Sequence, residues 1–460
     1  MNRLKTILAA ATAVAMLGAA GTAPGASAAV GLAPARGFAP RQLLVKVEGE
    51  AHGRAVRLPA GVGVHAAARA LRANPRVDYA VPNYIATASG AKGAGASEET
   101  PSELPDDPGT LGGPAEAATP LGDWTIKQWN FLAYEGTPTT RLPISPGGIN
   151  AVEAWQHLDA VGRPGAEGVT VAVLDTGVAY RSDGPLFRKS PDFTANQFVR
   201  GYDFVKNDPV PLDENGHGTH VAGTIAEKTN NGIGLTGLAY RAKLMPVRVL
   251  DAHGRGDAAD IARGIRFAVA HHAQVINMSF NFGCHKRVPT VDEALREAYA
   301  RGVVTVASAG NLGSESCVSE PATGPRVIAV GGTTEGGCLG YYALAGTAID
   351  VLAPGGGNPV TGCPSISARP IYQVTLRSGS TAEFTIPSNY VGTSMAAAHV
   401  SGLAAMVLAS GVLGKQPSPQ ASVEAVTRRI RATARSLDLP PTQQGAGLID
   451  AARATNPEVP

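Results

Sequence analysis

The chain has 460 residues, of which 44% are hydrophobic and 17% are charged. This composition permits a large folded core and argues against intrinsic disorder. Lysine and arginine total 39 and aspartate and glutamate total 37, which gives a net charge of +2. The charge balance therefore indicates neither a nucleic-acid partner nor an acidic membrane surface. The length allows one large domain or two to three smaller ones.

Residues 1–28 have the pattern of an export signal. Arg3 and Lys5 precede an apolar run over residues 7–20, and Ala26-Ser27-Ala28 offers a small-residue cleavage site. A buried N-terminal helix is the alternative, but no amphipathic segment continues the run. No later segment reaches the roughly 20 apolar residues that a membrane span needs. We therefore expect a protein secreted through a cleaved signal peptide, with no membrane partner.

Residues 29–86 predict a small α+β segment. Within it, residues 42–47 and 77–85 alternate like strands, and residues 64–73 are Ala-rich and helical in character. A piece this small buries too little surface to be robust alone, so it needs a partner surface. Residues 87–123 follow, rich in Gly, Ala, Pro, Ser and acidic residues, which indicates a flexible linker open to proteolytic processing.

From residue 124 to the end, short apolar runs alternate with amphipathic segments. The strand-like runs are residues 169–174, 243–250, 275–280, 303–307 and 327–330. The segments with helical spacing are residues 260–272, 291–300 and 422–434. Strands that are apolar on both faces and separated by amphipathic helices predict an α/β fold with a central, mostly parallel sheet covered by helices on both faces.

Three short sequences carry residue types that together perform nucleophilic catalysis. Asp175 ends the strand-like VAVLD, His217 lies in NGHGTHVAGT, and Ser394 lies in GTSMAAAHVSG, where an Ala-rich helix begins. A serine hydroxyl needs a base, a histidine supplies one near neutral pH, and an aspartate fixes the histidine tautomer. Asn311, after the strand-like residues 303–307, is a candidate amide donor for the oxyanion.

Each of these residues also has a plainer interpretation. Asp175 and Asn311 could be turn residues, Ser394 could be a helix N-cap, and His217 with His220 could bind zinc. The zinc interpretation fits poorly, because metalloprotease pairs prefer His at i and i+4 with a Glu between them. Asp175-Thr176-Gly177 also matches aspartic proteases, but the second such sequence that their chemistry needs does not occur in the chain.

Four cysteines, all in the C-terminal half, allow three pairings in an exported protein. We favour the sequence-local pairing of Cys284 with Cys317 and of Cys338 with Cys363. Metal binding by these cysteines is a poor alternative, since no CxxC spacing occurs.

The order Asp175, His217, Ser394 resembles that of the subtilase family of serine proteases. The resemblance extends over most of residues 124–454 and implies a subtilisin-like fold and endopeptidase activity on protein or peptide substrates through an acyl-enzyme. It also implies that Asn311 is the oxyanion residue and that His220 is a packing residue.

Residues 71–80 (LRANPRVDYA) resemble the family's inhibitor-like propeptide. The resemblance implies that residues 29–86 inhibit the enzyme within the precursor. Self-processing is then expected within residues 87–123, which leaves a monomeric catalytic domain at 124–460.

The sequence TNNGIGL at residues 229–235 looks like the family's calcium-binding loop. Oxygen-rich loops of this kind suit a hard cation. The ligands implied by the resemblance are Gln128, Asp192, Asn231 and the backbone carbonyls of Thr229, Ile233 and Leu235. A metal-free Asn-Asn-Gly turn is the alternative.

Substrate is expected to pair by main-chain hydrogen bonds with the strand at Ser279-Phe280-Asn281. Ser308, Ala309 and Gly310 are also expected to bind substrate. The residue before the cut is expected to be neutral and apolar or medium-sized.

The chain departs from the family pattern at three places. Asn281 stands where many relatives have Gly, which is expected to narrow the substrate preference. Ala398 replaces a Pro without expected loss of activity, because a helix interior accepts Ala. Residues 356–390 are longer than in simple members and predict an ordered insertion of unknown role.

Two further functions remain open at this point. A protease without activity could be retained as a peptide-binding protein, although every mechanistic position is filled. The same scaffold could also transfer the acyl group to an amine instead of water.

Overall fold

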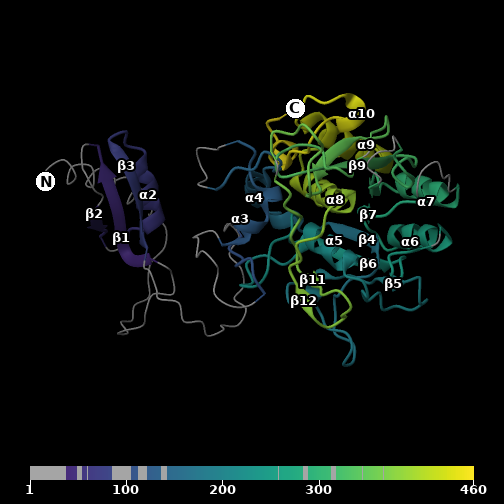
Figure 1. Cartoon of the computed structure of the whole chain (residues 1–460). Coiled ribbons are helices and arrows are strands. Elements are labelled where there is room, and N and C mark those ends of the chain that lie inside the picture. The colour runs from purple at the N-terminus through teal and green to yellow at the C-terminus, as the bar shows by residue number, and fades with distance from the viewer. Residues whose placement is uncertain are drawn as a thin grey trace. The chain divides into compact units, whose positions relative to one another are not determined.

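The structure is a computed structural model, and it describes residues 38–48, 54–59, 61–84, 105–111, 122–135, 142–256, 258–282, 289–311, 317–343, 345–365 and 367–459. The chain divides into two compact units, Met1–Ala96 and Ser97–Pro460, which are drawn together in Figure 1.

The first unit contains one antiparallel sheet and one helix. The strands β1 (Phe38–Val47), β2 (Arg54–Arg57) and β3 (Val77–Tyr84) pair in the order β2-β1-β3, and α2 is Val64–Arg72. Leu43 and Val45 alternate along β1 and are fully buried in one cluster with Ala68 and Leu71 of α2. The predicted strand–helix–strand order is therefore confirmed, and the core that it encloses is small.

The second unit is built around a sheet of seven parallel strands in the order β10-β9-β8-β7-β4-β6-β5. The strands are β4 (Thr170–Asp175), β5 (Tyr202–Asp203), β6 (Lys243–Arg248), β7 (Val275–Met278), β8 (Val304–Ser308), β9 (Val327–Thr333) and β10 (Val351–Pro354). Five of them match the predicted apolar runs. β5 and β10 were not predicted, because two and four residues give little periodicity to recognise.

Helices cover both faces of this sheet (Figure 1). The longer ones are α4 (Ala151–Ala160), α5 (His217–Ala226), α6 (Ala258–Ala270), α7 (Pro289–Ala300), α8 (Thr393–Ser410) and α9 (Pro419–Thr433). The shorter ones are α3 (Trp124–Lys127), α10 (Pro441–Gln444), α11 (Ala451–Thr455) and the 3-10 turns η1 (Trp129–Phe131), η2 (Pro164–Ala166) and η3 (Ala195–Gln197). The predicted α/β architecture, a parallel sheet with helices on both faces, is confirmed.

Alternation along the strands explains the two layers. Val171 and Val173 of β4 belong to a buried cluster with α4, α5, α8 and α9, whereas Ala172 and Leu174 belong to a second cluster with α6 and α7. Successive side chains of a strand point to opposite faces, so one apolar run packs against both helical layers.

Helix α8 is the central helix of the first layer. By length and composition it could cross a membrane, but 83% of it is buried inside the fold. A helix that is apolar on all sides has the character of a core element. Ala398 lies fully buried inside α8, so this departure from the family pattern is a packing position.

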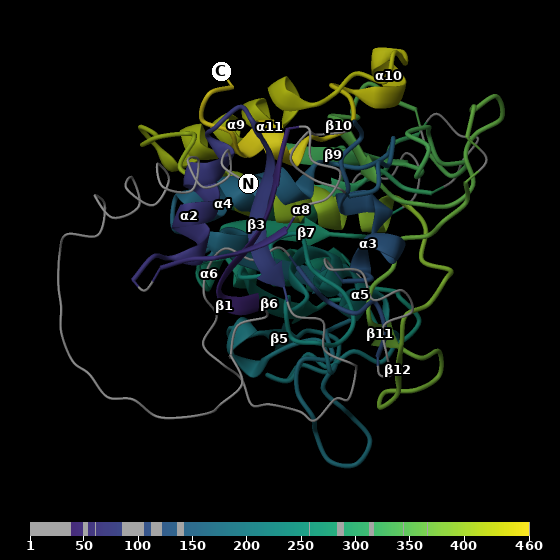
Figure 2. The same ribbon diagram turned by 90° about the vertical axis from the view of Figure 1, so that its left-hand side faces the viewer.

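The insertion at residues 356–390 forms a short hairpin. Its strands are β11 (Thr375–Leu376) and β12 (Phe384–Thr385), and β11 lies beside α5 in two views of the molecule (Figures 1 and 2). Cys338 and Cys363 form a disulfide. Cys317 is also disulfide-bonded, and Cys284, its expected partner, lies outside the described residues.

Residues 105–111 and 122–123 correct the expectation of a flexible linker throughout 87–123. Asp107 is fully buried. The Gly109 N–H donates to the Gly234 carbonyl, and the Gly234 N–H donates to the Thr110 carbonyl, each at 2.8 Å. The indole of Trp124 also donates to the Pro105 carbonyl at 2.7 Å. These backbone groups are satisfied by residues far along the chain, which composition alone does not reveal.

Candidate active site

Asp175 lies at the carboxyl end of β4, the edge of a parallel sheet where ligands usually bind. Its carboxylate is fully buried, and Oδ1 accepts the backbone N–H of Thr176 at 2.8 Å. The same oxygen is 2.8 Å from Nδ1 of His217. Because its partner is a histidine and not a second aspartate, the aspartic-protease interpretation is wrong.

His217 is the first residue of α5, directly after Gly216, whose φ of 102° favours glycine. The turn before it is held by Asp213, a residue that our sequence analysis missed. The buried Asp213 carboxylate accepts the backbone N–H groups of Asn215 and Gly216 at 2.8 and 2.9 Å, and the hydroxyl of Thr219 at 2.6 Å. Its position two residues before the Asn215-Gly216 turn is the sequence signal that could have identified Asp213.

The electrostatic surroundings of His217 favour its protonated form. Burial by itself lowers the pKa of the imidazole, but the charge of Asp175, the hydrogen bond to Asp175 and the charge of Asp213 raise it above its ordinary value. Asp175 thus fixes Nδ1 as the protonated nitrogen, which leaves Nε2 to accept a proton.

Ser394 is the second residue of α8, at the helix end where backbone N–H groups point outward. It lines one pocket together with His217 and Asn311. Within the described part of the chain, its hydroxyl donates to the Ser279 carbonyl at 3.1 Å and not to His217. Catalytic hydrogen bonds are often incomplete in ligand-free enzymes, so this rotamer does not argue against a role for Ser394.

Asn311 faces the same pocket from the end of β8. Its Oδ1 accepts both the backbone N–H and the hydroxyl of Thr393, each at 2.9 Å. These bonds fix the orientation of the side chain, and Asn311 lines the pocket. The four residues predicted from sequence are therefore brought together.

Residues 166–447 match the family described as the subtilase family, a span of more than half of the chain. The chain belongs to the subtilase family. It is 33% identical over 348 residues to a thermophilic serine proteinase of Bacillus sp. (strain AK1), covering 76% of this chain and 67% of that protein. Subtilisin BL of Lederbergia lenta is 36% identical over 310 residues, covering 67% of this chain and 98% of that protein.

A solved structure of a protease from Pseudoalteromonas arctica PAMC 21717 superposes on this subtilase with a TM-score of 0.59 and 30% identity, covering 77% of this chain and 99% of that one. The chain is thus a subtilisin-type serine protease, and it hydrolyses peptide bonds in protein or peptide substrates.

The two segments expected to bind substrate differ in their exposure to solvent in this subtilase. Asn281 is exposed, in the stretch that follows β7. Ser308 and Ala309 are fully buried, and the Ala309 N–H and C=O bind Val330 and Ser319. The backbone of Gly310 is bonded to the Thr393 hydroxyl. Backbone bonds therefore hold Ala309 and Gly310 in place, and substrate binding by Ser308, Ala309 and Gly310 stays a prediction.

His220, one turn after His217, has a different environment. Its ring stacks on Tyr390 with centroids 4.1 Å apart, and its Nε2 lies 3.0 Å from the Ile371 carbonyl. Burial lowers the pKa of His220 to about 3. The two imidazoles face different partners, so they do not form the zinc pair that spacing allowed, and His220 is a neutral packing residue.

The loop expected to bind calcium lies at the other end of α5. Asp192 is buried there, and its carboxylate accepts the Asn231 amide at 2.8 Å and the Leu235 N–H at 2.9 Å. Gln128 does not join them, because both its amide atoms bond to the backbone of Thr236. The Thr229 hydroxyl likewise contacts Thr236.

Two further buried carboxylates near this loop were missed by our sequence analysis. Asp107 accepts the backbone N–H groups of Asn230 and Asn231, and burial raises its pKa to about 8. Glu227 is fully buried, and burial followed by repulsion from Asp192 and Asp107 raises its pKa. Oxygen donors with excess buried negative charge fit a hard cation such as calcium, although no three acidic, His or Cys side chains among the described residues form a ready-made metal cluster.

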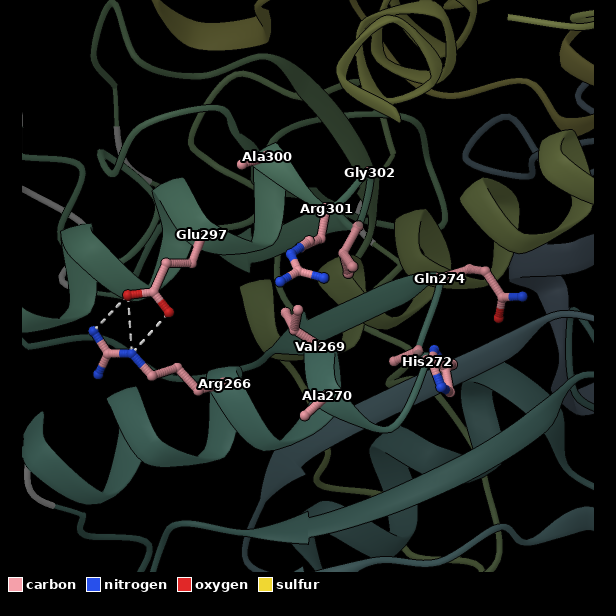
Figure 3. A pocket seen from close by; sticks show the side chains of 11 residues that line it. Arg266, Val269, Ala270, His272, Gln274, Glu297, Ala300, Arg301 and Gly302 are labelled. Carbon is pink, nitrogen blue, oxygen red and sulfur yellow. Dashed lines mark hydrogen bonds and ion pairs between the residues drawn. The ribbon is translucent and has the colours of Figure 1, made fainter. Parts of the chain in front are cut away.

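A larger pocket, of about 850 Å³, opens between α6 and α7 near their C-terminal ends (Figure 3). Arg266 and Glu297 form an ion pair at its rim, with 2.9 Å between Nε and Oε2. None of the residues predicted for catalysis, substrate or metal lines it, so pocket size does not locate the active site in this subtilase.

Proposed function

We propose that this subtilase cleaves peptide bonds through an acyl-enzyme formed on Ser394, with His217 as the base and Asp175 as its partner. The observation that carries the proposal is the 2.8 Å contact between His217 Nδ1 and Asp175 Oδ1, at a pocket that Ser394 and Asn311 share with His217. This arrangement has every group that acyl transfer needs.

The reaction begins when the Ser394 side chain turns from the Ser279 carbonyl towards His217. Its Oγ then bonds to the substrate carbonyl carbon while Nε2 takes the hydroxyl proton. The negative charge on the carbonyl oxygen is stabilised by the Asn311 amide and the backbone N–H of Ser394. The C–N bond breaks as the imidazolium returns the proton to the leaving amine. Water then repeats the sequence and releases the acid product and the free Ser394 hydroxyl.

The enzyme is made as a secreted, self-inhibited precursor. In this proposal residues 1–28 direct export, residues 29–86 act as the intramolecular inhibitor, and the active protein is a monomer. The backbone bonds that hold residues 105–111 against the loop at Gly234 support a processing cut before residue 105. A cut after residue 111 would detach a segment that carries the buried Asp107.

Calcium stabilises the fold at the loop around residues 229–235. Asp192, Asn231 and Asp107 would hold the ion together with carbonyls of the loop, and Gln128 is left out. The support comes from the pKa values of Asp107 and Asp192. Burial is the largest cause that raises both of them. A divalent cation removes the cost of keeping such groups charged.

Digestion of unfolded casein by wild-type and Ser394→Ala protein tests the main proposal. The wild type is expected to digest casein and to begin between residues 87 and 105 by mass spectrometry, whereas the variant does not digest casein and keeps residues 29–86. Removing this nucleophile reduces turnover on the order of 10⁶-fold, a magnitude that comes from subtilisin and not from this geometry.

Ser410→Ala is the matched control, because it removes a hydroxyl from the other end of α8. Equal digestion by Ser394→Ala and wild type would exclude Ser394 as the nucleophile. A folded, processed wild type without activity on any peptide would instead support a peptide-binding protein.

A further inference from the structure

The dipeptide Asn-Gly occurs twice in the sequence, at Asn215-Gly216 and at Asn231-Gly232. It is the dipeptide in which an asparagine loses its side-chain amide most readily, because glycine has no side chain to keep its backbone nitrogen away from the asparagine carboxamide. One copy directly precedes His217, and the other lies in the loop after α5. The two copies have different surroundings.

The side chains of the two asparagines are held in the same way. In each, Oδ1 accepts the backbone N–H two residues later, from His217 at 3.1 Å or from Ile233 at 3.0 Å. In each, Nδ2 donates to an oxygen, the Ala252 carbonyl at 2.9 Å or the Asp192 carboxylate at 2.8 Å. Such a turn folds the carboxamide back over the peptide bond to the intervening glycine. Any difference in reactivity must therefore come from the glycines.

Gly216 is closed to this reaction. It is buried, and its N–H donates to the Asp213 carboxylate at 2.9 Å. A Cβ added to Gly216 would lie 3.2 Å from the hydroxyl oxygens of both Thr375 and Tyr390. The amide of Asn215 is lost only if the Gly216 nitrogen gives up its proton and moves towards the carboxamide. Both the hydrogen bond and the packing oppose that movement.

Gly232 is open to the same reaction. It is exposed, and nothing lies within 4 Å of a Cβ added to it. Its N–H donates to no partner in the part of the chain that the structure describes. Hydroxide from solvent can therefore remove this proton without breaking a bond to those residues, and the nitrogen is free to approach the Asn231 carboxamide.

We propose that Asn231 is a site of spontaneous deamidation and that the fold protects Asn215 from the same change. The Gly232 nitrogen gives its proton to hydroxide and bonds to Cγ of Asn231. The C–N bond of the carboxamide breaks, and the amide nitrogen takes a proton from water and leaves as ammonia. Water then opens the cyclic imide at either of its carbonyls, which leaves aspartate or isoaspartate at this position.

This modification changes the charge of the loop. The Asn231 amide donates to the Asp192 carboxylate, so deamidation replaces a hydrogen-bond donor with a second carboxylate. The Asp107 carboxylate accepts the Asn231 N–H at 3.3 Å and lies close as well. Like charges at this distance repel each other. Deamidation therefore weakens the loop and leaves the groups around His217 unchanged.

Peptide mapping by mass spectrometry tests the proposal. The sample is full-length Ser394→Ala protein, chosen to limit self-digestion, and it is incubated folded at mildly alkaline pH. Asn231 is expected to convert at least about tenfold faster than Asn215, the factor that corresponds to one hydrogen bond to a carboxylate. In denaturant the two should convert at similar rates, because the fold no longer distinguishes Gly216 from Gly232.

Two outcomes of this experiment would overturn the proposal. In one, Asn215 converts as fast as Asn231 in the folded protein, which would show that the bond from Gly216 to Asp213 gives no protection. In the other, Asn231 stays unchanged in the folded protein although both asparagines convert in denaturant. That result would show that the hydrogen bonds of the Asn231 side chain protect it.

Gly232→Ala should slow the conversion of Asn231, because a side chain keeps the nitrogen from the carboxamide. Gly414→Ala is the matched control: both glycines are exposed, have positive φ (73° and 60°) and have nothing within 4 Å of an added Cβ. Equal conversion in the two variants would contradict the role of Gly232. Asn231→Asp, which carries the product, should lower the Tm in the presence of chelator by about 2–4 °C. An unchanged Tm would contradict the effect on the loop.

Discussion

The two ends of helix α5 hold buried charge in opposite ways. At the N-terminal end, the carboxylates of Asp175 and Asp213 face the imidazole of His217, whose pKa they raise. Beyond the C-terminal end, Glu227 faces Asp192 and Asp107, and repulsion adds to burial in raising the pKa of Glu227. The chain thus supplies its own counter-charge where we propose catalysis, whereas we propose that a cation from solution balances the acidic end.

Because of this difference, substitutions at the two ends of α5 are expected to affect different properties of the enzyme. Changes at the His217 end should alter turnover and leave stability largely intact, because the buried charges there are already paired. Changes at the Glu227 end should alter stability and leave the chemical step intact. The following experiments test that division.

The largest effect is expected for Asp175→Asn. Turnover should fall about 10⁴-fold, a magnitude taken from subtilisin, because the His217 tautomer is no longer fixed. His217 must be neutral to accept the proton, so activity is lost as pH falls through its raised pKa. Asparagine removes the charge that raises this pKa, so the acid limb of the kcat/KM profile should move to lower pH.

Asp183→Asn is the control, because Asp183 is exposed and pairs with the exposed Arg181 across 3.5 Å. An unchanged acid limb in Asp175→Asn, measured alongside this control, would contradict the assignment of His217 as the base.

Asn311→Asp is expected to lower turnover about 10²–10³-fold, again the range known from subtilisin. Aspartate keeps an acceptor for Thr393 but replaces the amide donor with a carboxylate that repels the oxyanion. Steady-state kinetics should show the loss in kcat, with KM little changed. A loss confined to KM would show that Asn311 binds the ground state and not the oxyanion.

Calcium removal tests the acidic end. A chelator is expected to lower the Tm by about 5–10 °C, since a ligand at a hundred times its Kd stabilises by about 2.7 kcal/mol. Asp192→Asn should lose most of this calcium-dependent difference. Calorimetry with and without excess calcium measures it, and an identical Tm in both conditions would favour the metal-free turn.

The smallest effect is expected for Glu227→Gln. In the presence of chelator this variant should raise the Tm by about 2–4 °C, because it removes one of the mutually repelling carboxylates. Its kcat on peptides should match wild type. A fall in kcat with unchanged Tm would show that the two ends of α5 are not independent.

Much of the catalytic unit followed from short stretches of sequence. The apolar run that ends at Asp175 predicted β4, and the Ala-rich sequence after Ser394 predicted the start of α8. The limits of α6, predicted from residue 260 to 272 and found at Ala258–Ala270, show the usual uncertainty at helix ends. The propeptide and the secretion signal remain predictions.

The sequence by itself determined five strands of the central sheet, the helices α6, α7, α8 and α9, and the four residues proposed for catalysis, because hydrophobic periodicity and local motifs are short-range properties. Only the tertiary structure decided that Asp107 packs against the loop at Asn231, that Ala309 is buried, and that Ser378 lines one pocket with His217. These facts depend on contacts between residues far apart in the chain, and no local pattern specifies which distant backbone groups a segment will meet.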